Sequence, residues 1–353
     1  MTTTIILTGC GGIPTQNVLW SLRYDKSDFR IVGVDCDSHH IYRSKGFDRK
    51  YLVPRADNPN YIGALNKIIQ KEKAEFVHPQ PDIEVGILSE KRENINAAMF
   101  LPEKEAVTLS HNKYNLLKAL KRAGIPCAET FLVKAEADLD EAFDALGSKV
   151  WIRLISGAGG RGSLPVENRE LARHWIEYWK GWGQFSAEEY LPGRNLAWQG
   201  VFKDGELVGS IAWERIRYII RHVSPSGITG TPSVAKLIDD ADVHEIGNNT
   251  IRAISKSPNG VFGVDMRGNT KGIPSVTEIN PGRFFTPSFM YAKSGYNLVK
   301  VFFEIGLGRS VTEKFEKRAP IPKNTFWIRA IDLEPKLVKI EKMPKVGDEI
   351  ITE

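Results

Sequence analysis

The stretch Lys149-Val-Trp-Ile-Arg-Leu-Ile-Ser-Gly-Ala-Gly-Gly-Arg-Gly-Ser163 indicates the fold more strongly than any other part of the sequence. It begins as a short apolar strand that carries Arg153 and runs into a loop with four glycines at positions 157, 159, 160 and 162. Without a Cβ, such a loop can bring its backbone N–H groups close to the oxygens of an anion. A strand arginine adds a fixed cation with a planar fork that matches phosphate. No Gly-Lys-Ser/Thr follows, so the loop is not a P-loop. It predicts a phosphate-binding strand and loop, with a plain glycine hairpin as the alternative.

Two strands further along the chain carry oxygen-bearing side chains. The run from Gly260 to Gly272 contains Asp265, and the following run Val276-Thr-Glu-Ile-Asn-Pro281 contains Glu278 and Asn280. Glu278 and Asn280 are two positions apart, so they share one face of their strand. Carboxylate and amide oxygens are hard ligands that suit a Mg²⁺ ion holding nucleotide phosphates. A solvated strand face is the alternative, and the apolar residues around Glu278 and Asn280 weigh against it.

The first hundred residues alternate short apolar strands with helical patterns. Thr4–Thr8, 29–34 and 75–79 read as strands, which predicts an open parallel sheet with helices on its faces. The turn after the first strand contains Gly9 and Gly11, but the third glycine of a dinucleotide motif is replaced by Pro14. A nicotinamide enzyme is therefore the less favoured interpretation of this turn. We favour an open α/β domain whose turn is structural or which contributes to the site of an acceptor substrate.

Composition limits the classes of protein that fit. The 353 residues are 42% hydrophobic and 26% charged, with a net charge of +5. A surplus this small and evenly spread suits small anionic ligands and argues against nucleic acid as a partner. No apolar run approaches the roughly 20 residues of a membrane span. Three scattered cysteines and an N-terminus without a secretory pattern lead us to expect a protein of the cytoplasm, with no membrane partner.

In their order and spacing, these motifs resemble those of the ATP-grasp superfamily. The chain is similar to the carbamoyl-phosphate synthase large subunit and to carboxylate–amine ligases. The resemblance implies an α/β and α+β protein in which an open parallel-sheet domain precedes two α+β subdomains that grip ATP. We expect an N-terminal domain over residues 1–107, a small subdomain with the glycine-rich loop over 108–187, a subdomain with the metal site over 188–317, and a β extension over 318–353.

The resemblance also implies roles for individual residues. Lys113 and Arg153 would contact the ATP phosphates, under the loop that contains Gly159, Gly160, Arg161 and Gly162. Glu188 and the backbone of Glu189 would meet the adenine amine, and the Leu191 N–H a ring nitrogen. The implied ligands of Mg²⁺ (or Mn²⁺) are Asp265, Glu278 and Asn280, with Arg283 beside the reacting phosphate. Two departures from the family pattern are Asn195, where the ribose-binding residue is usually Glu, and Gly282, which is inserted before Arg283.

The activity that the resemblance implies is ligation of two small molecules. A substrate carboxylate would attack the γ-phosphate of ATP, and an amine would then displace phosphate from the acyl phosphate. A kinase of bicarbonate or carbamate, similar to carbamoyl-phosphate synthase, and a nucleotide-binding protein without turnover are the alternatives. Arg217, Arg221 and His78 are candidate substrate contacts, although a solvated basic face explains the two arginines equally well. The segment after residue 318 is expected to cap the last subdomain or to form a subunit contact, which leaves a homodimer open.

Overall fold

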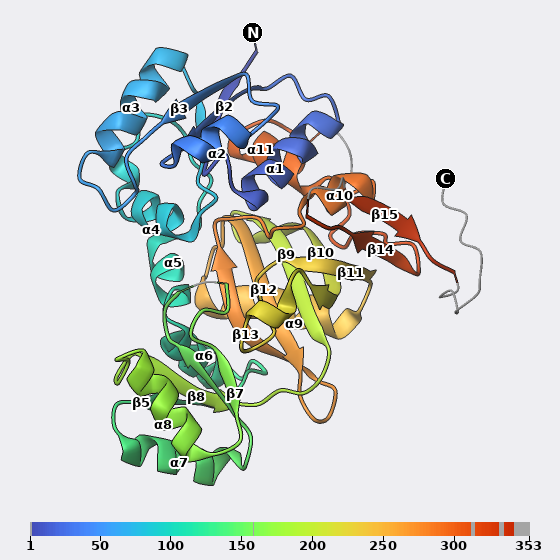
Figure 1. Ribbon diagram of the computed structural model, residues 1–353. Coiled ribbons are helices and arrows are strands. Elements are labelled where there is room, and N and C mark those ends of the chain that lie inside the picture. The colour runs from blue at the N-terminus through green and yellow to red at the C-terminus, as the bar shows by residue number, and fades with distance from the viewer. Residues whose placement is uncertain (1, 158, 312–314, 332–334, 342–353) are drawn as a thin grey trace.

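The structure, a computed structural model, describes residues 2–157, 159–311, 315–331 and 335–341. Three sheets form its framework (Figure 1). The N-terminal part is at the top of that view, a seven-stranded sheet is in the middle, and a small sheet is at the bottom. None of the helices within the described ranges is long and apolar enough to cross a membrane.

The N-terminal sheet is parallel, as the sequence predicts, with strand order β3-β2-β1-β4. All five residues of β1 are buried, which is typical of a parallel strand with helices on both faces. The Gly11 N–H donates to Asp35 Oδ2 at 2.9 Å, so the glycine-rich turn is bonded to the end of β2. The elements are β1 (Thr4–Thr8), α1 (Ile13–Tyr24), β2 (Arg30–Asp35), α2 (Ser38–Arg43), β3 (Arg49–Leu52), α3 (Tyr61–Glu72), β4 (Phe76–His78), α4 (Asp82–Glu90) and the 3₁₀ turn η1 (Arg92–Asn94).

Two short helices, α5 (Lys104–Ser110) and α6 (Lys113–Arg122), lead from the N-terminal part to the small sheet (Figure 1). This sheet is antiparallel with strand order β5-β8-β6-β7. Trp175 on α8, and Trp179 and Trp182 after it, pack against its hydrophobic core. The elements are β5 (Thr130–Val133), α7 (Glu136–Leu146), β6 (Val150–Leu154), β7 (Leu164–Val166), α8 (Arg169–Tyr178) and β8 (Phe185–Glu189).

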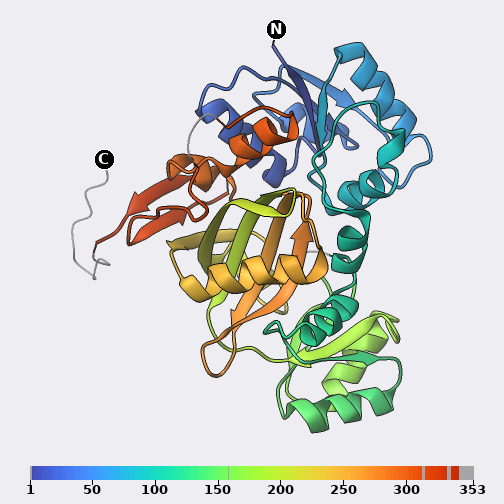
Figure 2. The same cartoon turned by 180° about the vertical axis from the view of Figure 1, so that it is seen from behind.

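The seven-stranded sheet has the order β13-β12-β9-β10-β11-β14-β15. Helix α9 covers one of its faces, as Figure 2 shows. Its strands are β9 (Asn195–Lys203), β10 (Glu206–Tyr218), β11 (Pro232–Ile238), β12 (Gly260–Gly268), β13 (Pro274–Pro281), β14 (Thr325–Ile328) and β15 (Lys336–Lys339). Its helical elements are the 3₁₀ turn η2 (Arg221–Val223), α9 (Ala241–Ile254), α10 (Phe289–Lys293) and α11 (Leu298–Gly306).

Two details refine the expected division of the chain, which otherwise stays a prediction. The boundary expected at residue 187 falls inside β8, and the connection at 190–194 separates the two sheets more cleanly. The strands β14 and β15 extend the seven-stranded sheet from β11 instead of forming a separate layer. Residues 342–353 of the expected extension lie outside the described residues.

Candidate functional site

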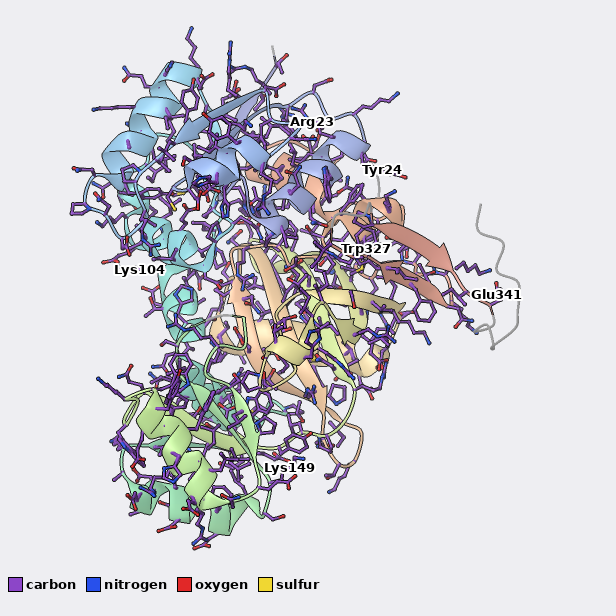
Figure 3. The ribbon with its side chains drawn as sticks, viewed as in Figure 1. Arg23, Tyr24, Lys104, Lys149, Trp327 and Glu341 are labelled. Carbon is purple, nitrogen blue, oxygen red and sulfur yellow. The ribbon has the colours of Figure 1, made fainter. Side chains whose placement is uncertain are left out.

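A cavity of about 350 Å³ lies between the small sheet and the seven-stranded sheet. Side chains from both sheets fill the region where they face each other (Figure 3). Strand alternation explains how β6 contributes. Val150 and Ile152 pack into the core of the small sheet, while Trp151 and Arg153 point the other way and line the cavity.

The predicted metal ligands come together on one wall of the cavity. Asp265 on β12 pairs directly with Glu278 on β13, so both side chains leave the same face of the sheet. Asn280, two residues further on β13, donates through Nδ2 to Asp265 Oδ2 at 2.9 Å. No cluster of three or more His, Cys, Asp or Glu side chains in the described ranges is arranged to hold a metal ion. Two carboxylates and an amide oxygen are nevertheless a suitable hard-oxygen set for Mg²⁺, provided that the Asn280 amide turns its oxygen toward Asp265.

Lys113 and Arg153 place two cations beside Glu278. Asn112 caps α6 by accepting the Asn115 N–H at 3.0 Å, which sets Lys113 at the first helical position. Lys113 Nζ donates to the Gly157 carbonyl at 2.6 Å and lies 3.5 Å from Glu278 Oε1. Arg153 Nη1 is 3.8 Å from Glu278 Oε2. Both cations are almost fully buried, so their charges act through little water.

Glu188, which was expected to contact adenine, is bonded to Arg153 in the structure. Its Oε1 accepts from Arg153 Nε at 2.9 Å and from Ser186 Oγ at 2.8 Å, and the residue is 2% exposed. Arg153 also donates to the Thr277 carbonyl at 2.6 Å, so it spans the two sheets. The Glu188 carboxylate therefore orients Arg153, and this bond competes with the expected contact to adenine.

A third cation, Arg215 on β10, lies on the same wall. It pairs with Asp265 Oδ1 and donates to Asn195 Oδ1 at 3.3 Å and to the Leu196 carbonyl at 3.2 Å. Its guanidinium carbon lies 5.3 Å from the ring centre of Phe285. The Arg215 side chain is only 8% exposed, although no pattern in the basic stretch of the sequence distinguishes it from Arg217 and Arg221.

Arg217 and Arg221, the predicted substrate contacts, lie apart from this cavity, and their role stays a prediction. Both are exposed, and neither lines this cavity. The pairing of β10 with β11 shifts register between Arg215 and Arg217 and again before Tyr218. These irregularities break the simple alternation of side chains, and Arg221 lies beyond the strand in η2. Two arginines four positions apart therefore do not face the site.

The other predicted nucleotide contacts line the hinge end of the cavity. Glu189, Leu191 and Asn195 are part of its lining, together with the apolar surfaces of Trp151 and Met266. Asn195 Nδ2 donates to the Tyr218 hydroxyl at 2.9 Å. Burial raises the pKa of Glu189 above its ordinary value. This end of the cavity is an apolar slot with polar groups at its edge.

Two loops close over the cavity. Gly159 and Gly160 line it from the glycine-rich loop, and Ile228 to Thr231 line it from the connection after β10. The loops touch, because a Cβ on Gly160 would lie 2.9 Å from the Ile228 carbonyl oxygen. The other two predicted loop residues turn away. Arg161 lies over the ring of Trp179, and the Gly162 carbonyl accepts from Trp175 Nε1 at 2.9 Å.

The end of the cavity opposite the hinge is formed with the N-terminal part of the chain. Arg283 pairs there with Asp82, the first residue of α4, and with the Asn280 oxygen. Asp82 was not among the predicted site residues, although the connection from β4 to α4 in which it follows Pro81 is where an α/β domain presents polar groups. A second cavity of about 710 Å³ shares Asp82, Glu278 and Asn280 with the first and adds Lys113 and His111.

His78, the third predicted substrate contact, lies away from both cavities. It is 1% exposed, lies among the rings of Phe284, Phe302 and Phe303, and lines neither of these two cavities. Burial lowers its pKa from 6.5 to about 4, so the ring is neutral near pH 7. Its Nε2 lies 3.0 Å from Gln80 Oε1.

Comparison with known proteins agrees with this arrangement. The model of the ATP-grasp domain family matches residues 110–287. An L-amino acid ligase from Bacillus licheniformis has a similar structure, with 13% identity, 92% of this chain and 78% of that chain covered, and a TM-score of 0.70. An N5-carboxyaminoimidazole synthetase from Staphylococcus aureus, complexed with ADP, has 15% identity, coverage of 92% and 81%, and a TM-score of 0.70. Biotin carboxylase from Campylobacter jejuni has 18% identity, coverage of 92% and 74%, and a TM-score of 0.67. No curated protein sequence matches the chain.

Proposed function

The chain belongs to the ATP-grasp family, and we propose that it is an ATP-dependent ligase. It activates a small carboxylate as an acyl phosphate, which an amine then attacks, with release of ADP and phosphate. The observation that carries the proposal is the grouping of Asp265, Glu278 and Asn280 with three buried cations at one end of a cavity whose other end is apolar. That asymmetry suits a nucleotide, which has an aromatic base at one end and phosphates at the other.

Adenine fits the hinge end, between Trp151 and Met266 and beside Leu191. The ribose would then lie near Asn195, and the phosphates would reach Arg153 and Lys113. One of the similar structures, the Staphylococcus aureus synthetase, is complexed with ADP, which supports the proposal that this fold binds a nucleotide here. Mg²⁺ or Mn²⁺ held by Asp265, Glu278 and Asn280 would neutralise part of the phosphate charge.

The cations at the phosphate end of the cavity would reduce the repulsion between the two negatively charged reactants. A carboxylate and a triphosphate repel each other, so catalysis depends on positioning and on neutralising negative charge. Each of the four cations is held in place by a group of the protein. The partners of Lys113, Arg153, Arg215 and Arg283 are the Gly157 carbonyl and the carboxylates of Glu188, Asp265 and Asp82. Cations that are positioned in advance need no reorganisation during the reaction.

The acceptor substrates would reach the phosphate end from the N-terminal side. The second cavity opens there and shares Asp82, Glu278 and Asn280 with the nucleotide cavity. Its lining carries both signs of charge, including Lys104, Lys113 and Glu90. A lining of mixed charge is compatible with a small acid and an amine.

A substrate screen tests the proposal. Release of ADP is measured with Mg²⁺-ATP while amino acids and small acids are supplied singly and in pairs, with bicarbonate included. The proposed ligase releases ADP only when an acid and an amine are both present. Release that bicarbonate alone stimulates would instead favour the kinase of bicarbonate or carbamate.

A variant pair tests the proposed metal site directly. Glu278→Gln keeps the shape of the side chain and removes a charge, so we expect magnesium-dependent ADP formation to fall by about two orders of magnitude or more. Glu245→Gln, at an exposed position of α9, should leave it unchanged. Undiminished turnover in Glu278→Gln would rule out the proposed metal site.

A further inference from the structure

The segment Arg283–Phe285 follows β13 and is not part of a strand. Gly282, with φ +71°, turns the chain out of β13. A Cβ at this position would lie 2.9 Å from Val85 Cγ1 and 3.0 Å from Leu101 Cδ2, so the turn packs closely against the N-terminal part. Gly282, which departs from the family pattern, therefore ends β13, and the backbone of the next three residues is not part of the sheet.

Two buried glutamines bond the backbone of this segment instead. Gln80 Nε2 donates to the Phe284 carbonyl at 2.5 Å, and the Phe284 N–H donates to Gln80 Oε1 at 3.2 Å. Gln199 Nε2 donates to the Arg283 carbonyl at 3.0 Å, and the Phe285 N–H donates to Gln199 Oε1 at 3.2 Å. Four consecutive backbone groups are thus paired by two side-chain amides.

Each glutamine is itself held by another buried side chain. His78 Nε2 lies 3.0 Å from Gln80 Oε1, and the Tyr291 hydroxyl donates to Gln199 Oε1 at 2.7 Å. Gln80 is 2% exposed and Gln199 is 0% exposed, so a lost partner would leave a buried polar group unpaired. These networks fix which way each amide points.

The two glutamines come from different parts of the fold. Gln80 follows β4 of the N-terminal sheet, and Gln199 lies on β9 of the seven-stranded sheet. Asp82, two residues after Gln80, pairs with the guanidinium of Arg283. The Arg283 side chain and the backbone of the next residue, Phe284, are therefore held from the N-terminal part. The Arg283 carbonyl is held by Gln199 of the seven-stranded sheet.

We propose that Gln80 and Gln199 are positioning residues that hold Arg283 at the phosphate end of the cavity, and that Asp82 sets the direction of its guanidinium. This inference rests on the proposed function, because it assigns the N-terminal part a role in phosphoryl transfer. Arg283 would contact the phosphoryl group as it moves. The glutamines would act only through Arg283. Their loss should therefore weaken binding of the transferring phosphoryl group and leave binding of the rest of the nucleotide unchanged.

The test separates those two kinds of binding. Affinity for MgADP is measured by calorimetry with and without aluminium fluoride, which stands in for the transferring phosphoryl group. The variants are Gln80→Met and Gln199→Met, which keep side-chain length and remove the hydrogen bonds, and Asp82→Asn, which lies at a partly exposed position. Arg283→Ala reports the full contribution of the arginine, and Gln70→Met, at an exposed position of α3, is the matched control.

We expect the wild type and Gln70→Met to bind MgADP more tightly when aluminium fluoride is present. The three positioning variants should bind MgADP alone with an affinity within about twofold of the wild type. The gain in MgADP affinity that aluminium fluoride causes should fall by tenfold or more in these variants, as in Arg283→Ala. Equal loss of both affinities together with a lower Tm would show a structural role and overturn the inference. Unchanged tightening in all three variants would also overturn it.

Failure of the proposed function gives a different result. A wild type that binds no MgADP refutes the nucleotide site, and the positioning role falls with it. A wild type that binds MgADP and is tightened by aluminium fluoride, while the positioning variants match Gln70→Met, refutes the positioning role alone. A wild type without tightening refutes the role given to Arg283.

Discussion

At the scale of single residues, Arg215 shows how the site carries charge before a metal ion binds. Its guanidinium pairs with Asp265, one of the proposed metal ligands, and both groups are largely shielded from water. Removing one member of a buried ion pair leaves the other charge uncompensated. A divalent cation on Asp265 would restore that compensation.

Mg²⁺ should therefore restore part of the stability that is lost when Arg215 is replaced. We expect Arg215→Met to lower the free energy of unfolding by about 2–4 kcal/mol without Mg²⁺. Mg²⁺ should then raise the Tm of this variant more than it raises that of the wild type. Thermal unfolding with and without Mg²⁺ measures both effects. Arg217→Met, two residues away and exposed, is the matched control and should change little. A similar loss in both variants would contradict the assignment.

Glu84 gives a pH dependence that can be isolated. Burial raises its pKa from 4.5 to about 7, with a smaller contribution from the nearby Asp35 carboxylate. Between pH 4.5 and 7 the folded state therefore binds more protons at this site than the unfolded state, and stability falls as the pH rises through that window. Above pH 7 the full cost of the buried charge is present.

Glu84→Gln should remove this cost. We expect the variant to match the wild type near pH 4.5 and to exceed its stability by roughly 2–3 kcal/mol at pH 8. Chemical denaturation at a series of pH values measures the difference. Glu93→Gln, at an exposed position of η1, should show no such trend. A difference that stays constant from pH 4.5 to 8 would refute the raised pKa.

At the scale of elements, the alternation of side chains predicted which residues face the cavity where β13 is regular but not in the irregular strand β10. Glu278 and Asn280 are correctly placed on one face because β13 keeps its alternation through them, and Asp265 pairs across from Glu278. Arg215 lines the cavity and Arg217 does not, and the sequence did not distinguish them because the irregularities in β10 leave no distinct residue pattern.

The remaining site residues depend on contacts distant in the chain. Asp82 reaches Arg283 only because the N-terminal sheet packs on the end of β13, and the pairing of Gln80 with Phe284 has the same origin. The spacing of residues within one segment carries no information about such contacts. The alternating strands and helices nevertheless predict the parallel N-terminal sheet that makes the contacts possible.

The contact between the two loops over the cavity can be tested with a pair of glycines. Gly160 has φ +73° and Gly124 has φ +74°, so alanine is similarly strained at both positions. Only at Gly160 would the added Cβ meet the other loop, at the Ile228 carbonyl, whereas no described atom lies within 4 Å of it at Gly124.

Both alanine variants should lose about 1–2 kcal/mol of stability, because alanine is strained in the left-handed backbone conformation. Gly160→Ala alone should weaken MgATP binding, by severalfold, because it forces the two loops apart. Calorimetric titration with MgATP and thermal unfolding separate the two effects. Equal affinities in the two variants would show that the contact between the loops does not matter for the nucleotide.

At the scale of the whole molecule, the N-terminal sheet and the helices after β13 share one hydrophobic core. Phe76 on β4 packs against Phe302 and Phe303 on α11, and Phe284 packs against Phe302. Figure 2 shows α11 against the N-terminal part, far in sequence from its strands. The phosphate end of the cavity thus lies where the N-terminal sheet packs against α11. We expect these two parts to unfold together because they share one hydrophobic core.

Truncation of Phe302 should weaken the whole protein at once. Its ring contacts Phe76, Phe100 and Phe284, so Phe302→Ala should lower the free energy of unfolding by about 3–5 kcal/mol. Because the core is shared, scanning calorimetry should still record one transition, shifted to lower temperature. Tyr178→Ala, at a position 77% exposed on α8, should leave that transition in place. Two separate transitions, of which only one shifts, would mean that the N-terminal part folds independently. The contacts of Asp82 with Arg283 and of Gln80 with Phe284 could then be lost while the two other sheets stay folded.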